Sequence, residues 1–298
     1  MQNNKDFRSG FVAILGRPNV GKSTLMNAMV GEKVAIVSQK AQTTRNRIMG
    51  ILTGGDYQAV FLDTPGIHKP RTELGNSMMK AVESALVDTE IVIFVIDASD
   101  IRGADEDLVE KYAARKSKKM LIINKIDKVT KEALMQVMER FSKYPMDEII
   151  PISAMKGDGV EVVKSAIRKH LPNGPQYFPE NYITDMPERF LIAEIVREKA
   201  LQNLSDEIPH GIGVEIMGIT QAKSGVTHIE ATLYCERDSH KSIIIGKHGA
   251  MIGKIGSAAR FEVERLLDKQ VNLKLWVKVV PDWRNRSSEL RNLGYIDS

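Results

Sequence analysis

The chain has 298 residues, 43% hydrophobic and 27% charged, which is too apolar for a disordered chain and long enough for two domains with cores of their own. A net charge of +4 gives a mild preference for anionic partners, and a single cysteine, Cys235, excludes an internal disulfide. The N-terminus lacks the apolar stretch of a secretory signal, and the longest apolar run, residues 91–96, is too short to span a bilayer. We therefore expect a cytoplasmic protein in a reducing compartment; attachment to a membrane surface stays open.

Short apolar runs alternate with longer helix-like stretches from Phe11 to about Leu171. Five runs are interpreted as strands: FVAILG (11–16), AVFLDT (59–64), IVIFVID (91–97), MLIINK (120–125) and EIIPIS (148–153). Strands that alternate with helices in this way predict βαβ units around a mostly parallel sheet. The first domain is therefore expected to be α/β and to span residues 1–172.

The first apolar run leads directly into GRPNVGKS, residues 16–23, and then into a helical stretch. Glycine, four residues and Gly-Lys-Ser form the P-loop pattern, and the strand and helix around it make a chance glycine turn the minor alternative. Backbone N–H groups from Asn19 to Ser23 are expected to surround a β-phosphate. Lys22 would reach the β- and γ-phosphate oxygens, and the Ser23 hydroxyl would bind Mg²⁺.

A second loop, LDTPG at residues 62–66, ends another apolar run. The Asp63 carboxylate is suited to hold a Mg²⁺-bound water, and the Gly66 N–H can meet a γ-phosphate. This loop therefore predicts a triphosphate rather than a diphosphate as the fully bound ligand.

Two further loops predict which base is bound. INKID, residues 123–127, follows a strand and places Asp127 at the same edge of the sheet as the P-loop. A carboxylate accepts both hydrogen bonds that guanine N1–H and its 2-amino group offer, and adenine offers neither. SAMKG, residues 153–157, can present the Ala154 N–H to guanine O6. A solvated turn is the alternative for either loop alone, but the loops together favour a guanine nucleotide.

A different pattern begins after the segment LPNGPQYFPEN, residues 171–181, which is rich in proline and glycine. We expect a linker at 173–183 and a second domain at 184–298. Its predicted elements are an amphipathic helix at 187–204, two strands joined by a turn near Gly225, a helix–loop–helix, and a last strand at 271–279. The order of elements in this α+β domain is thus α, β, β, α, α, β.

The loop between the last two helices is IIIGKHGA, residues 243–250. It lacks the Lys-Ser pair of a nucleotide loop, and no second base-reading motif follows it. Residues 237–278 carry nine Lys or Arg against four Asp or Glu, a net +5. A Gly-x-x-Gly loop in this element order resembles a type II KH domain, whose loop clamps single-stranded RNA. The alternative is a plain turn between helices.

The residues predicted to contact RNA gather around this loop. Its two glycines permit a sugar-phosphate chain to approach closely, and the residues between them add charge or hydrogen bonds. Ile243 to Ile245 and Ile252 are expected to form the groove for the bases. The predicted set is Lys241, Ile245, Gly246, Lys247, His248, Gly249, Ile252, Lys254 and Arg260.

Two residues of the last strand extend this hypothesis. Lys274 is a further expected phosphate contact, although a single lysine is more often solvated. Trp276 lies on the polar face of the strand with Lys274 and Lys278. It either stacks on a base or covers the stem of a helix, and the second is the commoner fate of such an aromatic side chain.

GRPNVGKS, DTPG, NKID and SAM resemble the G1, G3, G4 and G5 motifs of the translation-factor-related GTPases, in the branch that includes TrmE, Era and EngA. QKAQTTRNR, residues 39–47, resembles their G2 region. With the Gly-x-x-Gly loop added, the chain resembles the Era GTPases over nearly its full length. The resemblance implies a P-loop GTPase domain followed by a KH domain, with GTP or GDP and Mg²⁺ as ligands. It also implies the 3′ region of 16S rRNA and the 30S subunit as partners. A monomer is the simplest expectation, and we expect it in the cytoplasm, with peripheral association at the inner face of the cell membrane as an additional location.

The resemblance also assigns the nucleotide site. Ser23, Thr44 and Asp63 are implied as magnesium ligands; Thr43 is the alternative to Thr44, and we prefer Thr44. Lys22, Ser23, Thr44, Asp63 and Gly66 are implied as the catalytic group. The implied nucleotide-binding set is Gly16, Arg17, Pro18, Asn19, Val20, Gly21, Lys22, Ser23, Thr24, Asp63, Thr64, Pro65, Gly66, Ile67, Asn124, Lys125, Asp127, Ser153, Ala154 and Met155.

Ile67 follows DTPG, where many small GTPases have a water-orienting glutamine. An apolar side chain cannot orient water, so slow intrinsic hydrolysis is expected. Some relatives that have an asparagine at the position of Asn19 bind K⁺ there. Asn19 either takes part in binding K⁺ in this chain or only shapes the turn. The histidines show no metal-ligand spacing, so no metal beyond Mg²⁺ is expected.

Two other functions fit the same motifs. The chain is either a regulatory GTPase whose second domain binds protein, or a constitutive RNA-binding module whose nucleotide only stabilises the fold. RNA binding that is lost when the Gly-x-x-Gly loop is substituted would exclude the first alternative. An RNA affinity that differs between the GTP-analogue and GDP states would exclude the second.

Overall fold

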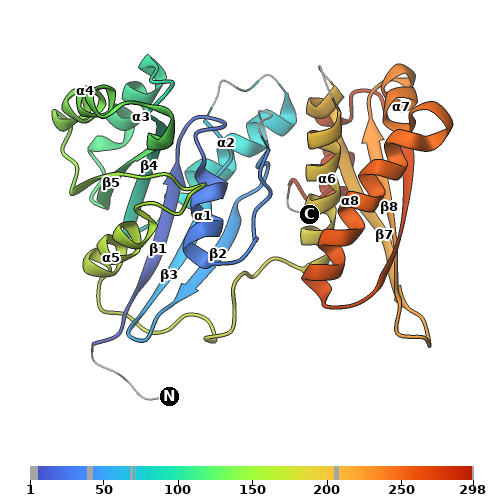
Figure 1. Ribbon diagram of the computed structural model, residues 1–298, viewed down its shortest axis with the longest axis horizontal. Helices are drawn as coiled ribbons and strands as arrows, with labels where there is room; N and C mark the ends of the chain where they lie inside the picture. Colours follow the sequence, from blue (N-terminus) through green and yellow to red (C-terminus); the bar gives the residue numbers. More distant parts are fainter. Residues whose placement is uncertain (1–5, 39–42, 68–69, 71, 205–207, 297–298) are drawn as a thin grey trace. The chain divides into compact units, whose positions relative to one another are not determined.

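The computed structural model describes residues 6–38, 43–67, 70, 72–204 and 208–296. Its contacts divide the chain into two compact units, which are described separately (Figure 1). The N-terminal unit comprises residues 1–35, 44–69 and 78–185, and the C-terminal unit comprises residues 36–43, 70–77 and 186–298. Two short segments from the first half of the sequence therefore belong to the C-terminal unit.

Six strands form the sheet of the N-terminal unit, in the order β2-β3-β1-β4-β5-β6. Every neighbouring pair is parallel except β2 and β3, so the predicted mostly parallel sheet is confirmed. The edge strand β2 is an element that the sequence analysis did not predict. The strands are β1 (Arg8–Leu15), β2 (Ile48–Thr53), β3 (Tyr57–Asp63), β4 (Ile91–Asp97), β5 (Lys118–Asn124) and β6 (Glu148–Pro151).

Helices pack on both faces of this sheet (Figure 1). Side chains of α2, α3 and α4 share an apolar cluster with β1, β4 and β5, whereas α1 and α5 contact each other and β3. β4 is buried along its whole length, which explains its unbroken apolar sequence. The helices are α1 (Lys22–Val30), α2 (Glu73–Ala85), α3 (Gly103–Ala113), α4 (Lys131–Ser142) and α5 (Val160–His170). Of α2, residues 78–85 belong to this unit.

The strand register brings the site-bearing loops to one edge of the sheet. Ile14 on β1 lies opposite Asp63 on β3, and Asp97 on β4 lies opposite Asn124 on β5. Since these strands are parallel, the loops that follow β1, β3, β4 and β5 all begin at the carboxyl ends of the strands, on one side of the sheet.

The C-terminal unit contains a second sheet, in the order β7-β8-β9. β7 and β8 are antiparallel with a bulge between Ile216 and Gly218, and β9 runs parallel to β8. The elements are α6 (Glu188–Asn203), β7 (Gly213–Gln221), β8 (Thr227–Cys235), α7 (Asp238–Ile245), α8 (Ala250–Leu267), β9 (Val271–Val279) and α9 (Ser287–Asn292). In the described part of the chain, no helix is long and apolar enough to cross a membrane.

The predicted order α, β, β, α, α, β is confirmed, and α9 follows it. The turn of the β7–β8 hairpin lies at Gly225, whose φ of 87° is in the left-handed region that favours glycine. The strand face that carries Ile229, Ala231 and Cys235 packs into the core of the unit. Cys235 is buried there, and burial raises the pKa of its thiol.

α6 differs from the amphipathic helix that was predicted. Arg197 is 0% exposed, and Glu194, Glu198 and Lys199 are also buried. Arg197 and Glu194 form an ion pair at 2.5 Å, and Lys199 and Glu198 form one at 3.1 Å. Burying a charge is unfavourable unless it is paired, so these pairs explain how the helix can bury its polar side as well as its apolar side.

Residues 36–43 supply further partners for α6 within the C-terminal unit. The Arg197 guanidinium donates to the Thr43 carbonyl oxygen, and the Val37 N–H donates to Glu198 Oε1 at 2.8 Å. These backbone contacts cannot be read from helical periodicity, because their partners lie more than 150 residues away in the sequence.

Candidate nucleotide site and nucleic-acid groove

The P-loop joins β1 to α1, and its glycines are needed for packing. A Cβ on Gly16 would lie 2.4 Å from the Val95 carbonyl oxygen, and a Cβ on Gly21 would lie 2.2 Å from Asn124 Nδ2. Gly21 caps α1 with a φ of 103°. The loop can thus lie against β4 and β5 only with glycine at both positions.

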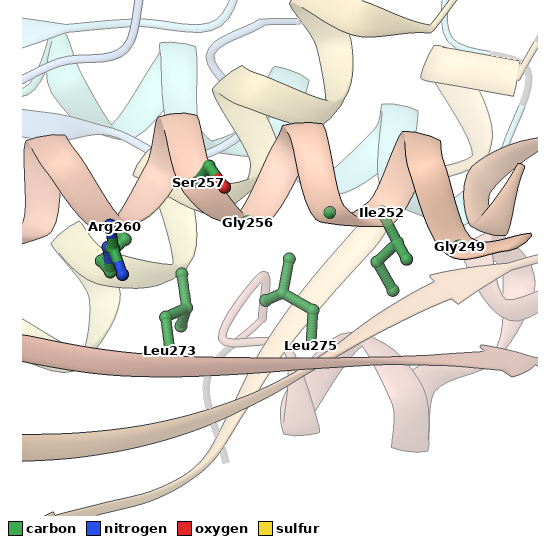
Figure 2. A pocket seen from close by; sticks show the side chains of 8 residues that line it. Gly249, Ile252, Gly256, Ser257, Arg260, Leu273 and Leu275 are labelled. Carbon is green, nitrogen blue, oxygen red and sulfur yellow. The ribbon is translucent and has the colours of Figure 1, made fainter.

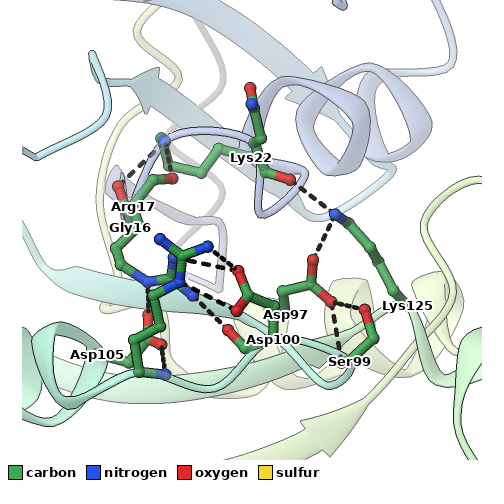
Figure 3. A network of polar contacts seen from close by, with 10 residues as sticks. Gly16, Arg17, Lys22, Asp97, Ser99, Asp100, Asp105 and Lys125 are labelled. Atoms are coloured by element: carbon green, nitrogen blue, oxygen red, sulfur yellow. Dashed lines mark hydrogen bonds and ion pairs between the residues drawn. The ribbon is translucent and has the colours of Figure 1, made fainter. Parts of the chain in front are cut away.

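Lys22 is enclosed by the loop that it follows. Its Nζ donates to the carbonyl oxygens of Gly16 and Arg17, at 3.1 and 3.0 Å (Figure 3). Burial lowers the pKa of Lys22 to about 8, with a smaller contribution from the positive charge of Arg17, although Asp63 opposes the shift. A buried ammonium beside a phosphate loop is ready to bind the anion that would stabilise its charge.

Three oxygen ligands meet beside Lys22. Ser23 Oγ donates to Asp63 Oδ2 at 2.6 Å and lies 3.1 Å from Thr44 Oγ1, and Thr44 Oγ1 lies 3.4 Å from the same carboxylate oxygen. The other oxygen, Asp63 Oδ1, is buried and has no hydrogen-bond partner among the described residues. Burial raises the pKa of Asp63. Hydroxyl and carboxylate oxygens are the ligands that Mg²⁺ prefers, so these residues fit the implied ion.

The two alternative threonines differ in position. Thr44 is buried beside Ser23 and Asp63, whereas the Thr43 hydroxyl donates to the Ser38 carbonyl oxygen at 3.4 Å. The geometry therefore favours Thr44 as the magnesium ligand. The preceding part of the G2 segment, residues 39–42, lies outside the described residues.

The base-reading loops are joined to the P-loop by Asn124. Its Nδ2 donates to the Val20 carbonyl oxygen at 2.8 Å, and its Oδ1 accepts from the Ala154 N–H at 3.0 Å. Asp127 accepts from Ser153 Oγ at 2.7 Å, which lowers the pKa of its carboxyl group. Asp127 is exposed at the edge of the site. The N-terminal unit thus brings the G1, G4 and G5 motifs together.

The DTPG loop packs directly on the P-loop. A Cβ on Gly66 would lie 2.7 Å from the backbone nitrogen of Pro18, and the Ile67 N–H donates to the Gly16 carbonyl oxygen at 3.2 Å. Thr64 is buried, and its hydroxyl donates to the Ile14 carbonyl oxygen at 2.7 Å. The Ile67 side chain packs against the apolar cluster of the unit. Pro65 lies within this loop, Thr24 lies in the first turn of α1, and Met155 is strongly exposed.

Sequence reasoning missed an acidic cluster after β4 (Figure 3). Asp97 accepts from Lys125 Nζ at 2.5 Å and from Ser99, and Lys125 also donates to the Asn19 carbonyl oxygen at 2.8 Å. Burial would raise the pKa of Asp97, but these hydrogen bonds outweigh it and the pKa lies below its ordinary value. The segment VIDASD, residues 95–100, carried the signal, because it ends a parallel strand at the same edge.

The same cluster anchors the Arg17 side chain. Arg17 Nε donates to Asp105 Oδ1 at 2.7 Å, and Asp105 is fully buried at the start of α3. Asp105 also accepts from the Arg102 N–H at 2.9 Å. Arg17 was predicted among the nucleotide-binding residues; its side chain is directed to α3, and its backbone belongs to the P-loop.

A groove of about 320 Å³ lies between α8 and β9 in the C-terminal unit (Figure 2). Ile252, Leu273 and Leu275 project into the space between the two elements, and Arg260 lies farther along α8. The lining residues are Gly249, Ile252, Gly253, Gly256, Ser257, Arg260, Leu273 and Leu275. Apolar walls with one end basic suit bases and a phosphate chain.

The Gly-x-x-Gly loop closes one end of this groove. Gly246 and Gly249 have φ of 73° and 79°, and His248 between them has 51°. A Cβ on Gly246 would lie 2.8 Å from the Met251 backbone nitrogen, whereas one on Gly249 would have no described atom within 4 Å. Lys247 and His248 are exposed. The open space beside Gly249 leaves its backbone accessible to a ligand.

The structure brings only part of the predicted RNA set to the groove. Gly249, Ile252 and Arg260 line it, whereas Lys241, Ile245 and Lys254 do not. The prediction that Ile244 helps to form the groove is wrong, because its side chain is buried in the core. Gly253, Gly256 and Ser257 were missed, although small residues at helical spacing on α8 could have indicated them.

Comparison with known proteins identifies the family of this chain. A family model described as a 50S ribosome-binding GTPase matches residues 11–125, and a KH domain model matches residues 207–284. GTPase Era of Ruminiclostridium cellulolyticum is 48% identical over 292 residues, which cover 97% of this chain and 98% of the relative. GTPase Era of Clostridium botulinum strain Alaska E43 is 50% identical, over 97% of this chain and 99% of that protein. The chain belongs to the Era family of GTPases.

Solved structures of Era agree with this assignment. Era in complex with MgGDPNP and nucleotides 1506–1542 of 16S ribosomal RNA matches with a TM-score of 0.93 and 42% identity, over 98% of this chain and all of that one. A variant of Aquifex aeolicus Era bound to GDP.AlF4⁻ matches with the same TM-score, identity and coverage. The P-loop GTPase fold and the KH domain expected from the sequence are thus confirmed.

Proposed function

We propose that this Era GTPase is a slow, Mg²⁺-dependent GTP-hydrolysing switch whose nucleotide state governs RNA binding by its KH domain. The observation that carries the proposal is that one chain combines a guanine-type nucleotide site with a groove beside a Gly-x-x-Gly loop. We assign hydrolysis to residues 1–172 and RNA binding to residues 184–298, joined by the linker at 173–183. The RNA is the 3′ region of 16S rRNA during 30S assembly. The relative solved with MgGDPNP and 16S rRNA supports this choice.

The residues of the nucleotide site have separate roles in this proposal. Lys22 and the loop N–H groups bind the β- and γ-phosphates, and Asp127 selects guanine. Ser23, Thr44 and Asp63 would hold Mg²⁺, which would supply positive charge for the phosphate oxygens. Ile67 has no group that can orient water, so hydrolysis is slow and depends on electrostatic stabilisation of the phosphates.

A binding assay tests the RNA half of the proposal. We expect the protein to bind an oligonucleotide matching the 16S rRNA 3′ end, with an affinity that falls steeply as salt rises. Gly246→Asp and Gly249→Asp place a carboxylate where the phosphates approach and should abolish binding. GTP hydrolysis without RNA, which uses the other unit, is the matched control and should be unchanged. Retained RNA binding in both variants would show that the RNA does not use this loop, and no RNA binding by the unmodified protein would favour the alternative of a protein-binding second domain.

Nucleotide choice tests the other half. Calorimetric titration should show that GTP and GDP bind much more tightly than ATP, because adenine cannot use the two acceptor sites of Asp127. Equal affinity for ATP and GTP would contradict the assignment of the base-reading loops.

We also propose that K⁺ stimulates hydrolysis through Asn19. Asn19 has a φ of 65°, and its carbonyl oxygen lies 2.8 Å from Lys125 Nζ. Asparagine tolerates this left-handed conformation, so the turn-shaping alternative predicts the same backbone. Hydrolysis rates in KCl and NaCl at matched ionic strength distinguish the two, and equal rates would remove the K⁺ proposal.

The remaining parts of the proposal concern the cell. We propose a cytoplasmic monomer, with peripheral association at the inner face of the membrane as an additional location. Sedimentation of the purified protein tests the monomer, and fractionation of cells in low and high salt tests the location.

A further inference from the structure

Trp276 is an exposed aromatic residue that the groove does not use. It lies on β9 and is 59% exposed, so it does not cover the stem of a helix. An exposed aromatic ring offers a face on which a nucleic-acid base can stack. Of the two fates considered for Trp276, the structure leaves base stacking.

β9 presents different residues to its two faces. Side chains alternate along a strand, and the odd-numbered Leu273 and Leu275 line the groove. The even-numbered residues Lys274, Trp276 and Lys278 are exposed on the other face. We call these three residues the β9 outer face. The β9 outer face and the groove lie on opposite faces of β9, which is the edge strand of the sheet.

The C-terminal segment covers only one end of this side of the sheet. Trp283 Nε1 donates to the Gly211 carbonyl oxygen, and a Cβ on Gly213 would lie 2.9 Å from Leu293. Gly213 pairs with Tyr234, which is buried and pairs in turn with Lys278. The cover therefore reaches the Tyr234 end of the sheet, and Trp276 lies beyond it.

The charge of the outer face is positive at the edge. Within the described residues, neither Lys274 nor Lys278 forms an ion pair, and Lys278 Nζ lies 5.4 Å from the Tyr234 ring centre. Three carboxylates lie on this side of the sheet: Glu230 faces Lys274 from β8, Glu215 on β7 accepts from the Tyr234 hydroxyl, and the charge of Glu289 on α9 acts on Tyr234. The edge strand itself presents the two lysines, so an anionic chain that follows β9 meets positive charge there.

We propose that the β9 outer face binds a second stretch of the same single-stranded RNA that occupies the groove. A base stacks on Trp276, and Lys274 and Lys278 contact the phosphates on either side. The RNA leaves the groove and crosses the exposed edge of β9. This inference rests on the proposed RNA-binding function and extends the contact beyond the about four nucleotides that a KH loop clamps.

Tryptophan fluorescence tests the contact in the unmodified full-length protein. Trp283 is 0% exposed, so the neutral quencher acrylamide reports on Trp276. An oligonucleotide of about four nucleotides fills the groove and should leave Trp276 accessible, whereas one of about 12 nucleotides should quench its fluorescence and protect it from acrylamide. Equal accessibility with both oligonucleotides bound would overturn the proposal.

Variants provide an independent measurement. Trp276→Ala should weaken binding of the long oligonucleotide by about 5- to 150-fold and leave the short one unchanged. Trp276→Phe, which keeps a stacking ring, should recover most of the loss. Lys274→Ala should reduce the salt dependence for the long oligonucleotide by about one released ion. Met135→Ala, which removes an apolar side chain 69% exposed on α4, is the control and should bind both as the unmodified protein does.

The outcomes separate this inference from the function on which it rests. If the unmodified protein binds neither oligonucleotide, both fail. If Gly246→Asp and Gly249→Asp abolish binding while Trp276→Ala binds both lengths normally, RNA binding stands and the outer face serves another partner, such as a protein. If Trp276→Ala weakens both lengths equally, Trp276 supports the fold or the groove, and the second contact is contradicted.

Discussion

A single amide side chain connects three loops of the nucleotide site. Asn124 pairs with the Val20 carbonyl oxygen and the Ala154 N–H, both of which are buried. The sequence predicted Asn124 from its motif, but it predicted a ligand contact rather than a connection between loops. Local sequence patterns predict which residues form the site and that they lie at the carboxyl ends of the strands. They do not predict the hydrogen bonds between the loops, because the fold brings these loops together from distant parts of the sequence.

Asn124→Ala should therefore weaken both the fold and nucleotide binding. It leaves two buried backbone groups unpaired, at a cost of about 1–3 kcal/mol each in the free energy of unfolding. Urea unfolding of nucleotide-free protein measures the effect, and GDP affinity should fall with it. Asn181→Ala changes an exposed asparagine and serves as the control. If the two variants unfold alike, Asn124 does not connect the loops.

The protonation of Lys22 should make nucleotide affinity depend on pH. The pKa of Lys22 is lowered to about 8 in the nucleotide-free site, and bound phosphates raise it again. Below pH 8 the lysine is already charged and contributes no pH dependence. Above pH 8 binding takes up a proton, so affinity falls as pH rises, by at most about tenfold per unit.

Calorimetry measures this proton uptake directly. GDP titrations in buffers of different ionisation enthalpy should show more uptake at pH 8.5 than at pH 7. Lys22→Arg, whose charge does not titrate in this range, should lack the difference. An identical difference in both proteins would assign the titration to another group.

At the level of elements, α6 shows most clearly what periodicity leaves out. Its position and length follow from its sequence, and both are close to the prediction. Its buried charges cannot be predicted in this way, because the pattern for a buried helix is apolar and the compensating partners are distant in the sequence. These partners are Val37, Thr43 and Glu262. β2 was missed for a related reason: it is an antiparallel strand at the edge, where tertiary pairing rather than sequence decides the structure.

Arg197→Ala tests whether this buried cluster stabilises the C-terminal unit. It leaves Glu194 buried without its partner, which typically costs about 3–5 kcal/mol in the free energy of unfolding. Arg189→Ala removes an exposed arginine from the same helix and should change stability by about 0.5 kcal/mol or less. Chemical unfolding compares the two variants. Equal stabilities would show that Arg197 contributes no more than a surface charge.

At the scale of the whole molecule, the C-terminal unit includes segments of the GTPase sequence. Residues 36–43 end next to Thr44, and residues 70–77 follow the DTPG loop by only a few positions. A linear division into domains cannot express this arrangement. Within the C-terminal unit, the Ser77 hydroxyl donates to the Tyr295 carbonyl oxygen at 2.6 Å. Segments that adjoin the nucleotide-binding motifs in the sequence therefore belong to the C-terminal unit.

Whether the protein is a nucleotide-dependent switch is decided by its affinity for a 16S rRNA 3′-end oligonucleotide, measured with a GTP analogue and with GDP at one salt concentration. We expect dissociation constants that differ by at least about fivefold between the two states, and by reciprocity the RNA should change the ratio of GTP-analogue to GDP affinity by the same factor. Equal RNA affinity in both states would contradict the switch and would leave a constitutive RNA-binding protein whose nucleotide only stabilises its fold.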